Sequence, residues 1–260
     1  MNAPARLRVG VIGAGRVGAV IGAALRSAGH ELVGVSVRSN PTLAELFLPG
    51  VPVLSTDEVV RRADVVLVGV PDDAIAGVVA GLDLHPAQVV VHFSGRHGLA
   101  VLGDVARPMA LHPVFPFTGG PADLDGISWG VTAREPLAEE LVRELGGVPV
   151  RVAEELRPLW HAALAHGANH LVTLVSSAAD MLRAAGADNP GDVLRPLLTA
   201  ALDGALELGD AALTGPVKRG DVGTVRAHLD VVPDPELYLA LARATARRAG
   251  TSAVLGEVLT

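Results

Sequence analysis

The chain of 260 residues contains no cysteine. This absence excludes disulfide bonds, thiolate metal sites and a thiol nucleophile, and it is compatible with a cytoplasmic protein. Aromatic residues make up only 3% of the chain, so the core must be built from Val, Leu and Ala. A net charge of −7 argues against a nucleic-acid-binding protein, because such proteins usually carry a basic face.

Long apolar runs are also missing. No run reaches the ~20 residues that a membrane-spanning helix needs. The first apolar run begins at Val9 without the small-residue cleavage site of a secretory signal. We therefore expect a soluble cytoplasmic protein that binds neither membrane nor nucleic acid, with one large or two modest domains.

A glycine motif follows the first apolar run directly. Residues 9–12 predict a buried strand, residues 19–28 predict a helix, and residues 32–37 predict a second strand. Between the first strand and the helix stand three glycines spaced as G-x-G-x-x-G. They allow a tight turn, close approach of a pyrophosphate and close helix–strand packing, respectively. We predict dinucleotide binding by Gly13, Ala14, Gly15, Arg16, Val17 and Gly18.

The end of the second strand indicates which dinucleotide binds. An NAD site normally carries Asp or Glu there, to bind the ribose 2′-hydroxyl. This chain has no carboxylate from Leu32 to Ala44 and instead carries Arg38 and Ser39. A cation beside a hydroxyl suits a 2′-phosphate, so the sequence favours NADP. The alternative is that Arg38 is a solvated side chain at a strand end.

Strands and helices continue to alternate up to residue 152, which predicts a doubly wound α/β sheet, the Rossmann domain, over residues 1–152. The further strands expected are residues 51–54, 64–70, 88–92, 109–111, 127–132 and 148–152. The further helices expected are residues 42–48, 55–62, 71–82 and 136–146, and Ser55 and the Pro71–Asp73 segment are expected to cap two of them.

Ligands bind such sheets outside the carboxyl ends of the strands. That rule selects three segments. We expect the cofactor to contact Val70, Pro71, Asp72, Ser94 and Gly95, and we expect His112 to face the nicotinamide. The alternative for His112 is a histidine held by the turn at Pro113.

From residue 153 onward the strand pattern fades and Ala and Leu recur at helical spacing. Residues 153–260 predict an all-helical domain, with helices at 155–185, 190–209, 218–229 and 235–249. The first of these helices is apolar on too many sides to pack on one sheet alone. We expect the same domain of a second subunit to cover it, which gives a homodimer.

The order of these domains resembles the 6-phosphogluconate dehydrogenase-like superfamily, which includes β-hydroxyacid dehydrogenases, ketopantoate reductase and pyrroline-5-carboxylate reductase. More narrowly, the chain resembles Rossmann-like proteins that carry the C-terminal domain of unknown function 2520. The segments that carry this resemblance are residues 13–18, 70–72, 92–95, 111–113, 160–163, 168–169 and 213–221, with Thr224 and His228. The resemblance implies the fold and NADP-linked redox chemistry.

The superfamily also suggests where a proton donor lies. The β-hydroxyacid dehydrogenases carry K-x-x-x-N on a helix. Asn169 matches the Asn here, but Ala165 stands at the Lys position. His161 shares the same helix face, since positions 161, 165 and 169 are spaced by four. It could replace the lysine as an acid near pH 7; otherwise it is a histidine that a backbone carbonyl satisfies.

Two cations follow the Gly215-Pro216 turn. Lys218 and Arg219 are expected at a helix start, where the helix dipole does not favour them. We interpret Arg219 as a clamp for a substrate carboxylate and Lys218 as a reserve proton donor. The alternative is a salt bridge from Arg219 to Asp221 or Glu207.

Metal binding is not expected. His166 and His170 are four residues apart, but no carboxylate accompanies them. The sequence thus predicts an NADP(H)-dependent reductase of a small carboxylated keto or imino compound, with ketopantoate reductase-like activity nearest. Pyrroline-5-carboxylate reductase-like imine reduction is one alternative. A non-catalytic NADP-binding sensor or scaffold protein is another, because the helix lysine is missing.

Overall fold

The computed structural model describes residues 6–38 and 40–259. The chain forms two compact units, which divide between Gly167 and Ala168. The described strands all lie in the first unit, and the described elements from Glu154 onward are all helices. The first part of the long helix that begins at Arg157 therefore belongs to the first unit.

The first unit is built on one mixed sheet with the strand order β2-β1-β3-β4-β5-β6-β7. Its neighbouring strands are parallel, apart from the antiparallel pair β5–β6. The bounds are β1 Arg8–Ile12, β2 Glu31–Ser36, β3 Val65–Val68, β4 Val89–His92, β5 Arg107–Pro113, β6 Ser128–Ala133 and β7 Val148–Arg151. The order of the chain reverses between β1 and β3, which is where such sheets bind nucleotides.

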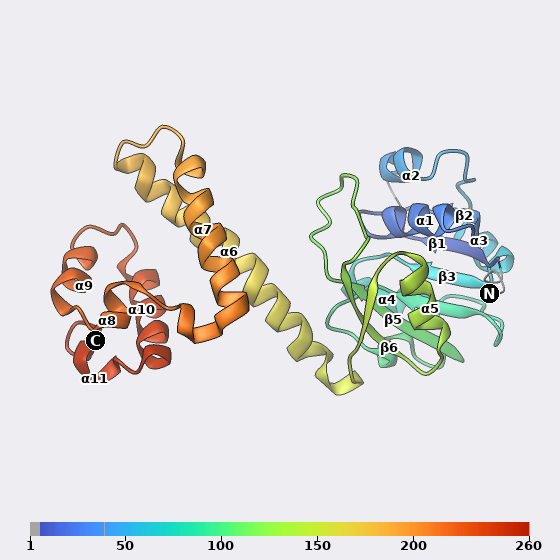
Figure 1. The fold of residues 1–260 in the computed structure, drawn as a ribbon. Coiled ribbons are helices and arrows are strands. Elements are labelled where there is room, and N and C mark those ends of the chain that lie inside the picture. The colour runs from blue at the N-terminus through green and yellow to red at the C-terminus, as the bar shows by residue number, and fades with distance from the viewer. Residues whose placement is uncertain (1–5, 39, 260) are drawn as a thin grey trace. The chain divides into compact units, whose positions relative to one another are not determined.

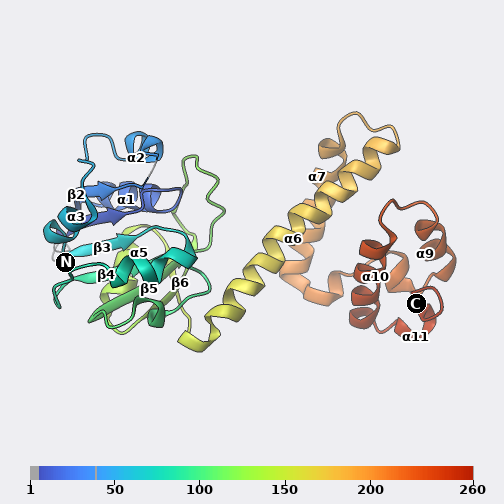
Figure 2. The same cartoon turned by 180° about the vertical axis from the view of Figure 1, so that it is seen from behind.

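Helices cover both faces of this sheet because the strand side chains alternate between two apolar clusters. In β3, Val65 and Leu67 belong to one cluster, and Val66 and Val68 belong to the other. The first cluster includes α1 (Gly18–Ser27), α2 (Thr42–Phe47) and α5 (Leu137–Glu144). The second includes α3 (Thr56–Arg62), α4 (Ile75–Ala80) and the short 3-10 helix η2 (Leu99–Leu102). Figures 1 and 2 show this arrangement from opposite sides.

Two sequence predictions need correction in this unit. The strand expected at residues 51–54 is only a single bridge between Val53 and Val35, and Pro52 has no N–H to extend the ladder. The helix expected at residues 71–82 begins as a 3-10 turn, η1 (Asp72–Ala74), and continues as α4. No side chain caps its start. The cap expected from Ser55 is confirmed, because its Oγ accepts the N–H of Glu58 at 3.3 Å.

The helical region begins with the 3-10 turn η3 (Glu154–Leu156) and α6 (Arg157–Ala184). It continues with α7 (Pro190–Leu208), η4 (Gly209–Ala212), α8 (Gly215–Arg219), α9 (Val222–Leu229), α10 (Pro235–Ala249) and α11 (Ser252–Leu255). The single helix predicted over residues 218–229 is wrong. Gly220 adopts φ +69° and ends α8. Asp221 then caps α9, where its carboxylate accepts the N–H of Thr224 at 3.0 Å.

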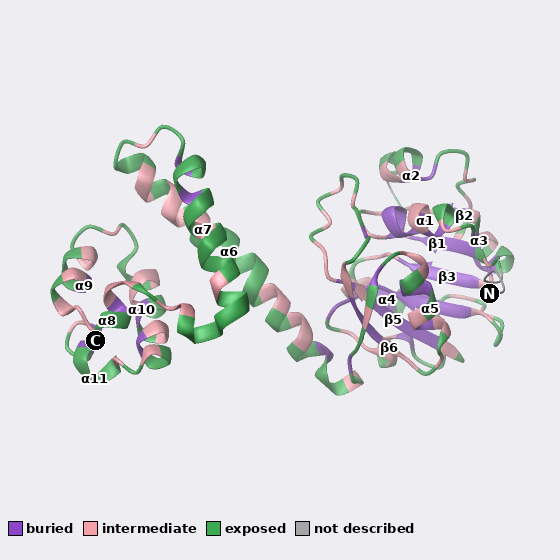
Figure 3. Cartoon of the chain, in the orientation of Figure 1, coloured by how far each residue is buried: buried purple, intermediate pink, exposed green. Residues whose placement is uncertain are grey.

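The core of the second unit comes from its C-terminal part. Its buried cluster consists of Val217, Val225, Ala242, Ala246, Leu255 and Leu259. Within the described chain, the part of α6 in this unit buries no residue, and α7 buries only Pro190 and Leu194. Figure 3 shows both helices coloured mainly as exposed or intermediate. None of the described helices is long and apolar enough to cross a bilayer.

Candidate functional site

Three glycines meet where β1, α1 and β3 come together. Gly13 has φ +82°, which only glycine adopts readily. A Cβ on Gly18 would lie 2.4 Å from the carbonyl oxygen of Gly13, and a Cβ on Gly69 would lie 2.9 Å from the Cα of Gly18. The expected close packing at Gly18 is thus confirmed, and Gly69 joins it from the end of the neighbouring strand. The sequence analysis assigned no role to Gly69, although the residue follows a buried strand.

A cleft of about 710 Å³ opens beside these glycines. A Cβ on Gly15 would meet only one atom within 4 Å, at 3.9 Å, so the backbone there is open to a ligand. The described residues that line the cleft include no carboxylate, and they include the exposed Arg16 and Arg38. They are Ile12, Gly13, Ala14, Gly15, Arg16, Ser36, Val37, Arg38, Asn40, Leu43, Thr56, Gly69, Val70, Pro71, Ala74 and Val78. Ser39 lies outside the described residues.

This lining fits NADP. Phosphate groups would meet the glycine turn, the N-terminus of α1 and the two arginines. Where an NAD site carries a carboxylate, β2 ends at Ser36, whose hydroxyl is paired with that of Thr56 at 3.0 Å. Apolar side chains of Leu43, Pro71 and Val78 give the cleft a wall that suits a planar ring.

The loops after β3 and β4 are tied together by Asp72. Its carboxylate accepts the hydroxyl of Ser94 at 2.7 Å and the Nε–H of Arg96 at 3.3 Å. The backbone N–H of His97 donates to the Ser94 hydroxyl at 3.2 Å. Ser94 is buried, and its only hydroxyl proton is committed to Asp72. The two predicted cofactor residues Asp72 and Ser94 therefore also fix the shape of the site.

His112 lies near the end of β5 and is held by a tryptophan. The indole Nε1–H of Trp160 donates to its Nδ1 at 3.2 Å. The residue opposite His112 on β6 is Gly130. A Cβ on Gly130 would lie 2.8 Å from the indole nitrogen, so glycine at this position lets Trp160 reach the histidine.

The two histidines predicted as catalytic residues come together beside Gly95. The rings of His112 and His161 lie edge to face, with centroids 5.9 Å apart. A Cβ on Gly95 would lie 2.8 Å from Nε2 of His112 and 2.5 Å from Cδ2 of His161. Both imidazoles therefore pack closely against Gly95, and any larger residue there would collide with them.

A buried cation lies behind these residues. Arg157, at the start of α6, is fully buried. Its guanidinium donates to the carbonyl oxygens of Ser94 and Gly130 and to the hydroxyl of Thr132. No carboxylate of the described chain forms a salt bridge with it, and its Nε has no partner. Burial lowers the pKa of Arg157 to about 10, a value that still keeps it charged at neutral pH.

Burial and the Arg157 charge also act on two histidines of this unit. Together they lower the pKa of His112 to about 4. His92, at the end of β4, is fully buried, and burial lowers its pKa to about 4 as well. Its Nδ1 accepts the N–H of Ser94 at 3.2 Å, and its Nε2 donates to the carbonyl of Gly98 at 2.8 Å. Both rings are neutral at pH 7, and His92 shapes the loop that carries Ser94 and Gly95.

The other predicted catalytic residues belong to the second unit. Asn169 is exposed on α6. Lys218 and Arg219 are exposed in the last turn of α8, which ends at Arg219. The expectation that they stand at a helix start is wrong, because Gly220 separates α8 from α9. The dipole of α8 favours cations there, so this position gives no sign of a functional constraint.

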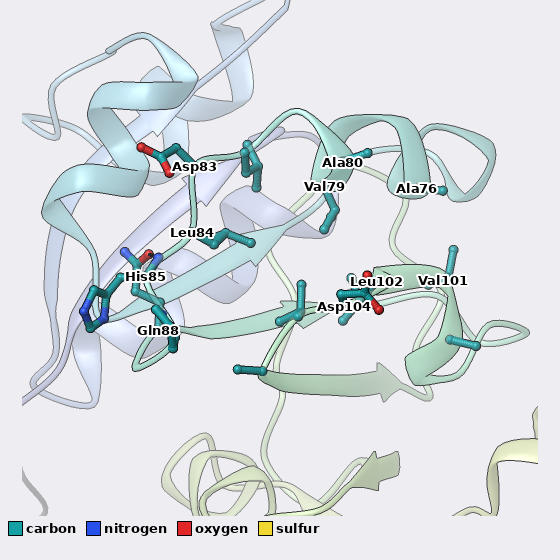
Figure 4. A pocket seen from close by; sticks show the side chains of 16 residues that line it. Ala76, Val79, Ala80, Asp83, Leu84, His85, Gln88, Val101, Leu102 and Asp104 are labelled. Atoms are coloured by element: carbon teal, nitrogen blue, oxygen red, sulfur yellow. Dashed lines mark hydrogen bonds between the residues drawn. The ribbon is translucent and has the colours of Figure 1, made fainter.

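No group of three or more metal-ligating side chains occurs among the described residues. A second hollow of the first unit, drawn in Figure 4, is lined by Ala76, Asp83, Leu84, His85 and residues 100–106, among others. Its loops precede β4 and β5, so it lies at the amino ends of these strands, opposite the glycine turn. The candidate site is therefore the carboxyl edge alone.

Comparison with known proteins agrees with this architecture. The sequence matches a Rossmann-like domain over residues 2–113 and the domain of unknown function DUF2520 over residues 127–245. No functionally curated protein matches the sequence.

Solved structures share the fold over nearly the whole chain. A candidate NADP oxidoreductase from Bacteroides fragilis is 23% identical with a TM-score of 0.78, and the match covers 93% of this chain and 98% of that protein. The protein TM1727 from Thermotoga maritima is 24% identical with a TM-score of 0.72, over 94% and 99% of the two chains. Pyrroline carboxylate reductase from Plasmodium falciparum, solved with NADP bound, is 12% identical with a TM-score of 0.62, over 96% and 98%.

The predicted fold class is thus confirmed, and the chain matches a Rossmann-like domain followed by the domain of unknown function DUF2520.

Proposed function

We propose that the protein is an NADP(H)-dependent oxidoreductase that reduces a small carboxylated keto or imino compound. The observation that carries this proposal is the cleft beside the glycine turn. Its described lining includes Arg16 and Arg38 and no carboxylate. The histidine pair His112 and His161 stands at the carboxyl edge of the same sheet, beside Gly95.

Reduction of a keto or imino group needs few protein groups beyond those of the cleft and the histidine pair. Bound NADPH would supply the hydride. The protein must orient the substrate, polarise the group that is reduced and provide a proton. His161 packs against Gly95 next to His112 and is the proposed proton donor. The buried charge of Arg157 makes this edge of the sheet positive, which favours a substrate that carries a carboxylate.

The fold supports two substrate types. Ketopantoate reductase-like reduction of a keto acid is the nearest specific activity that the sequence resemblance implies. Imine reduction is the alternative, and it is favoured by the likeness to a pyrroline carboxylate reductase over 96% of this chain. A sensor or scaffold that binds NADP without turnover is the remaining possibility.

Cofactor choice is tested first. Arg38→Ala removes the exposed cation that the proposal pairs with the 2′-phosphate. Loss of a charge-assisted contact should weaken NADPH binding by about 10- to 100-fold and leave NADH binding almost unchanged. Arg61→Ala removes an exposed arginine of α3 outside the cleft and is the matched control. Equal loss of NADPH and NADH affinity would contradict the 2′-phosphate assignment.

Turnover is tested with a panel of 2-keto acids and cyclic imines, by following NADPH oxidation. Steady oxidation with one class, reduced by about 100-fold or more in His161→Ala, is the expected result. Tight NADPH binding with no oxidation across the panel would instead support the sensor.

We also propose that two copies of the chain associate through α6 and α7. These helices expose Leu171, Val172, Leu174, Val193, Leu197, Leu202, Leu206 and Leu208. Obligate dimers bury such surfaces as if they were a divided core. A second copy is the simplest occupant, because the same apolar helices on both sides would cover each other symmetrically.

A further inference from the structure

The hydrogen bond from Trp160 fixes the protonation of His112. An indole N–H can only donate, so Nδ1 of His112 must present its lone pair to Trp160 at 3.2 Å. The proton of the neutral imidazole is then on Nε2. An imidazolium would carry a proton on both nitrogens, and its Nδ1–H would oppose the indole N–H. The contact therefore selects one neutral tautomer.

The selected proton lies at the candidate site. Nε2 of His112 faces Gly95, 2.8 Å from where a Cβ would stand. No described residue accepts a hydrogen bond from this Nε2. His161 packs against the same glycine from α6. A substrate oxygen that reaches this ring would meet an N–H donor whose other ring nitrogen is already engaged.

The charged and titratable groups around His112 favour the same form. Arg157 and His161 come from α6, His92 comes from β4, and Asp72 comes from the turn after β3. Burial and the Arg157 charge lower the pKa of His112, and the carboxylate of Asp72 raises it more weakly. Asp72 is itself engaged by Ser94 and Arg96. The neutral ring thus stands in a positive local field.

We infer that Trp160 is a positioning residue, which holds His112 as a neutral Nε2–H donor to the oxygen of a substrate carbonyl. This inference rests on the proposed function and selects a keto acid over an imine. A carbonyl oxygen accepts a hydrogen bond and gains negative charge during reduction, so a fixed donor in a positive field stabilises it. An imine is reduced in its protonated form, whose N–H needs an acceptor and not a fixed N–H donor.

The electron and proton balance assigns separate roles to the two histidines. Bound NADPH would supply the hydride to the carbonyl carbon, and the electron pair of the C=O π bond would move to the oxygen. The proton that completes the alcohol comes from the imidazolium of His161, which becomes neutral. His112 keeps its proton throughout. NADPH becomes NADP⁺, and the keto acid becomes a hydroxy acid.

Nuclear magnetic resonance of protein labelled with ¹⁵N in histidine tests the tautomer without any substrate. Long-range ¹H–¹⁵N spectra distinguish the two neutral tautomers and the imidazolium, and His112→Gln identifies the His112 signals. The wild-type protein should show the neutral Nε2–H form from about pH 5.5 to 8. Trp160→Phe should give a mixture of tautomers. A wild-type His112 that carries its proton on Nδ1, or that titrates in this range, would overturn the inference.

Trp129→Phe is the matched control for these spectra. Trp129 is also buried in the first unit, but its Nε1 has no hydrogen-bond partner among the described residues. Its replacement removes an indole from the core without removing a contact to a histidine. The His112 signals should therefore stay as in the wild type, and a change equal to that of Trp160→Phe would overturn the assignment to one hydrogen bond.

Kinetics then test the carbonyl. With a keto acid, Trp160→Phe should lower kcat by about 3- to 10-fold, as for loss of one hydrogen bond, with little change in KM. His112→Gln should lower kcat by about 100-fold or more. Faster turnover of cyclic imines than of keto acids would overturn the carbonyl assignment. If neither class is turned over, the proposed function fails, and the spectra alone decide the role of Trp160.

Discussion

The sheet of the first unit and the helix pair α6–α7 are both rich in apolar residues, but only the sheet is covered. All four residues of β3 are buried, and so are all four of β4. In contrast, Leu197 of α7 is 65% exposed and Leu206 is 78% exposed. Each buried Leu contributes roughly 1.5–3 kcal/mol relative to an exposed one, so the helix pair leaves a large stabilisation unrealised.

This difference shows that the first unit covers the apolar residues of its sheet by itself, whereas α6 and α7 leave theirs exposed. The first unit contains the glycine turn, the cleft and the histidine pair, and its helices pack on both faces of the sheet. The second unit has a core only in α8 to α11 and Leu259. The proposed ligand contacts thus rest on a buried core, whereas α6 and α7 expose the apolar side chains that the proposed second copy would cover. Three substitution experiments test this difference between the two units.

The largest effect is expected on the surface of α7. Leu197→Glu would place a carboxylate in the proposed dimer interface, and symmetry would place it there twice. Burial of an unpaired charge is costly, so the dissociation constant of the dimer should rise by at least about 100-fold. Analytical ultracentrifugation over a range of protein concentrations measures it.

Leu46→Glu is the matched control. Leu46 is 62% exposed on α2 of the first unit, so the chemical change and the exposure are nearly the same. This variant should keep the mass of the wild type. If the two variants sediment alike, or if the wild-type protein is a monomer, the helix pair needs no second copy and the contrast fails.

An intermediate effect is expected at Gly69. Its added Cβ in Gly69→Ala would lie 2.6 Å from the carbonyl oxygen of Gly13 and close to the backbone of Gly18. Backbone cannot move aside as a flexible side chain does, so the first unit should lose about 1–3 kcal/mol of its free energy of unfolding. NADPH affinity should fall as well, because the turn at Gly13 must shift. Urea denaturation and NADPH titration measure the two losses.

Gly77→Ala controls for the loss of a glycine. Gly77 lies within α4, and nothing stands within 4 Å of its added Cβ. Alanine favours helix over glycine, so this variant should be unchanged or more stable by up to about 1 kcal/mol. Equal destabilisation by both substitutions would mean that the glycine contact at the turn has no special role.

Local chemistry made the first half of the fold predictable. The glycines at 13, 15 and 18, the cap at Ser55 and the alternation of strands and helices depend on neighbouring residues. The wrong prediction that Lys218 and Arg219 stand at a helix start also concerned neighbouring residues. Gly220 can either continue a helix or end it with positive φ, and the predicted helix over residues 218–229 ran through it.

The contacts around His112 could not be predicted in this way. His112 and His161 were selected separately, one from a strand end and one from a helix face. Their meeting depends on the antiparallel pairing of β5 with β6, which sets Gly130 opposite His112. It also depends on Arg157, which anchors the start of α6 to the carbonyl oxygens of Ser94, just after β4, and of Gly130 within β6. These partners are up to 63 residues apart in the chain, so no local pattern indicates them.

A smaller effect for each pH unit is expected from acid, and it concerns the first unit. His92 and His112 have folded-state pKa values lowered to about 4, whereas a histidine in the unfolded chain titrates near about 6.5. Below about pH 6.5 the unfolded state therefore binds protons that the folded state does not bind, and the free energy of unfolding falls as the pH drops toward about 4.

Each histidine contributes a slope of at most about 1.4 kcal/mol per pH unit. His112→Gln should remove its share of that slope. Because Trp129 and Trp160 are the two tryptophans of the chain and both lie in the first unit, tryptophan fluorescence during urea denaturation reports on that unit alone. If His112→Gln leaves the pH dependence of the free energy of unfolding unchanged, His112 titrates in the folded protein as it does in the unfolded chain. The buried charge of Arg157 would then have no effect on the pKa of His112.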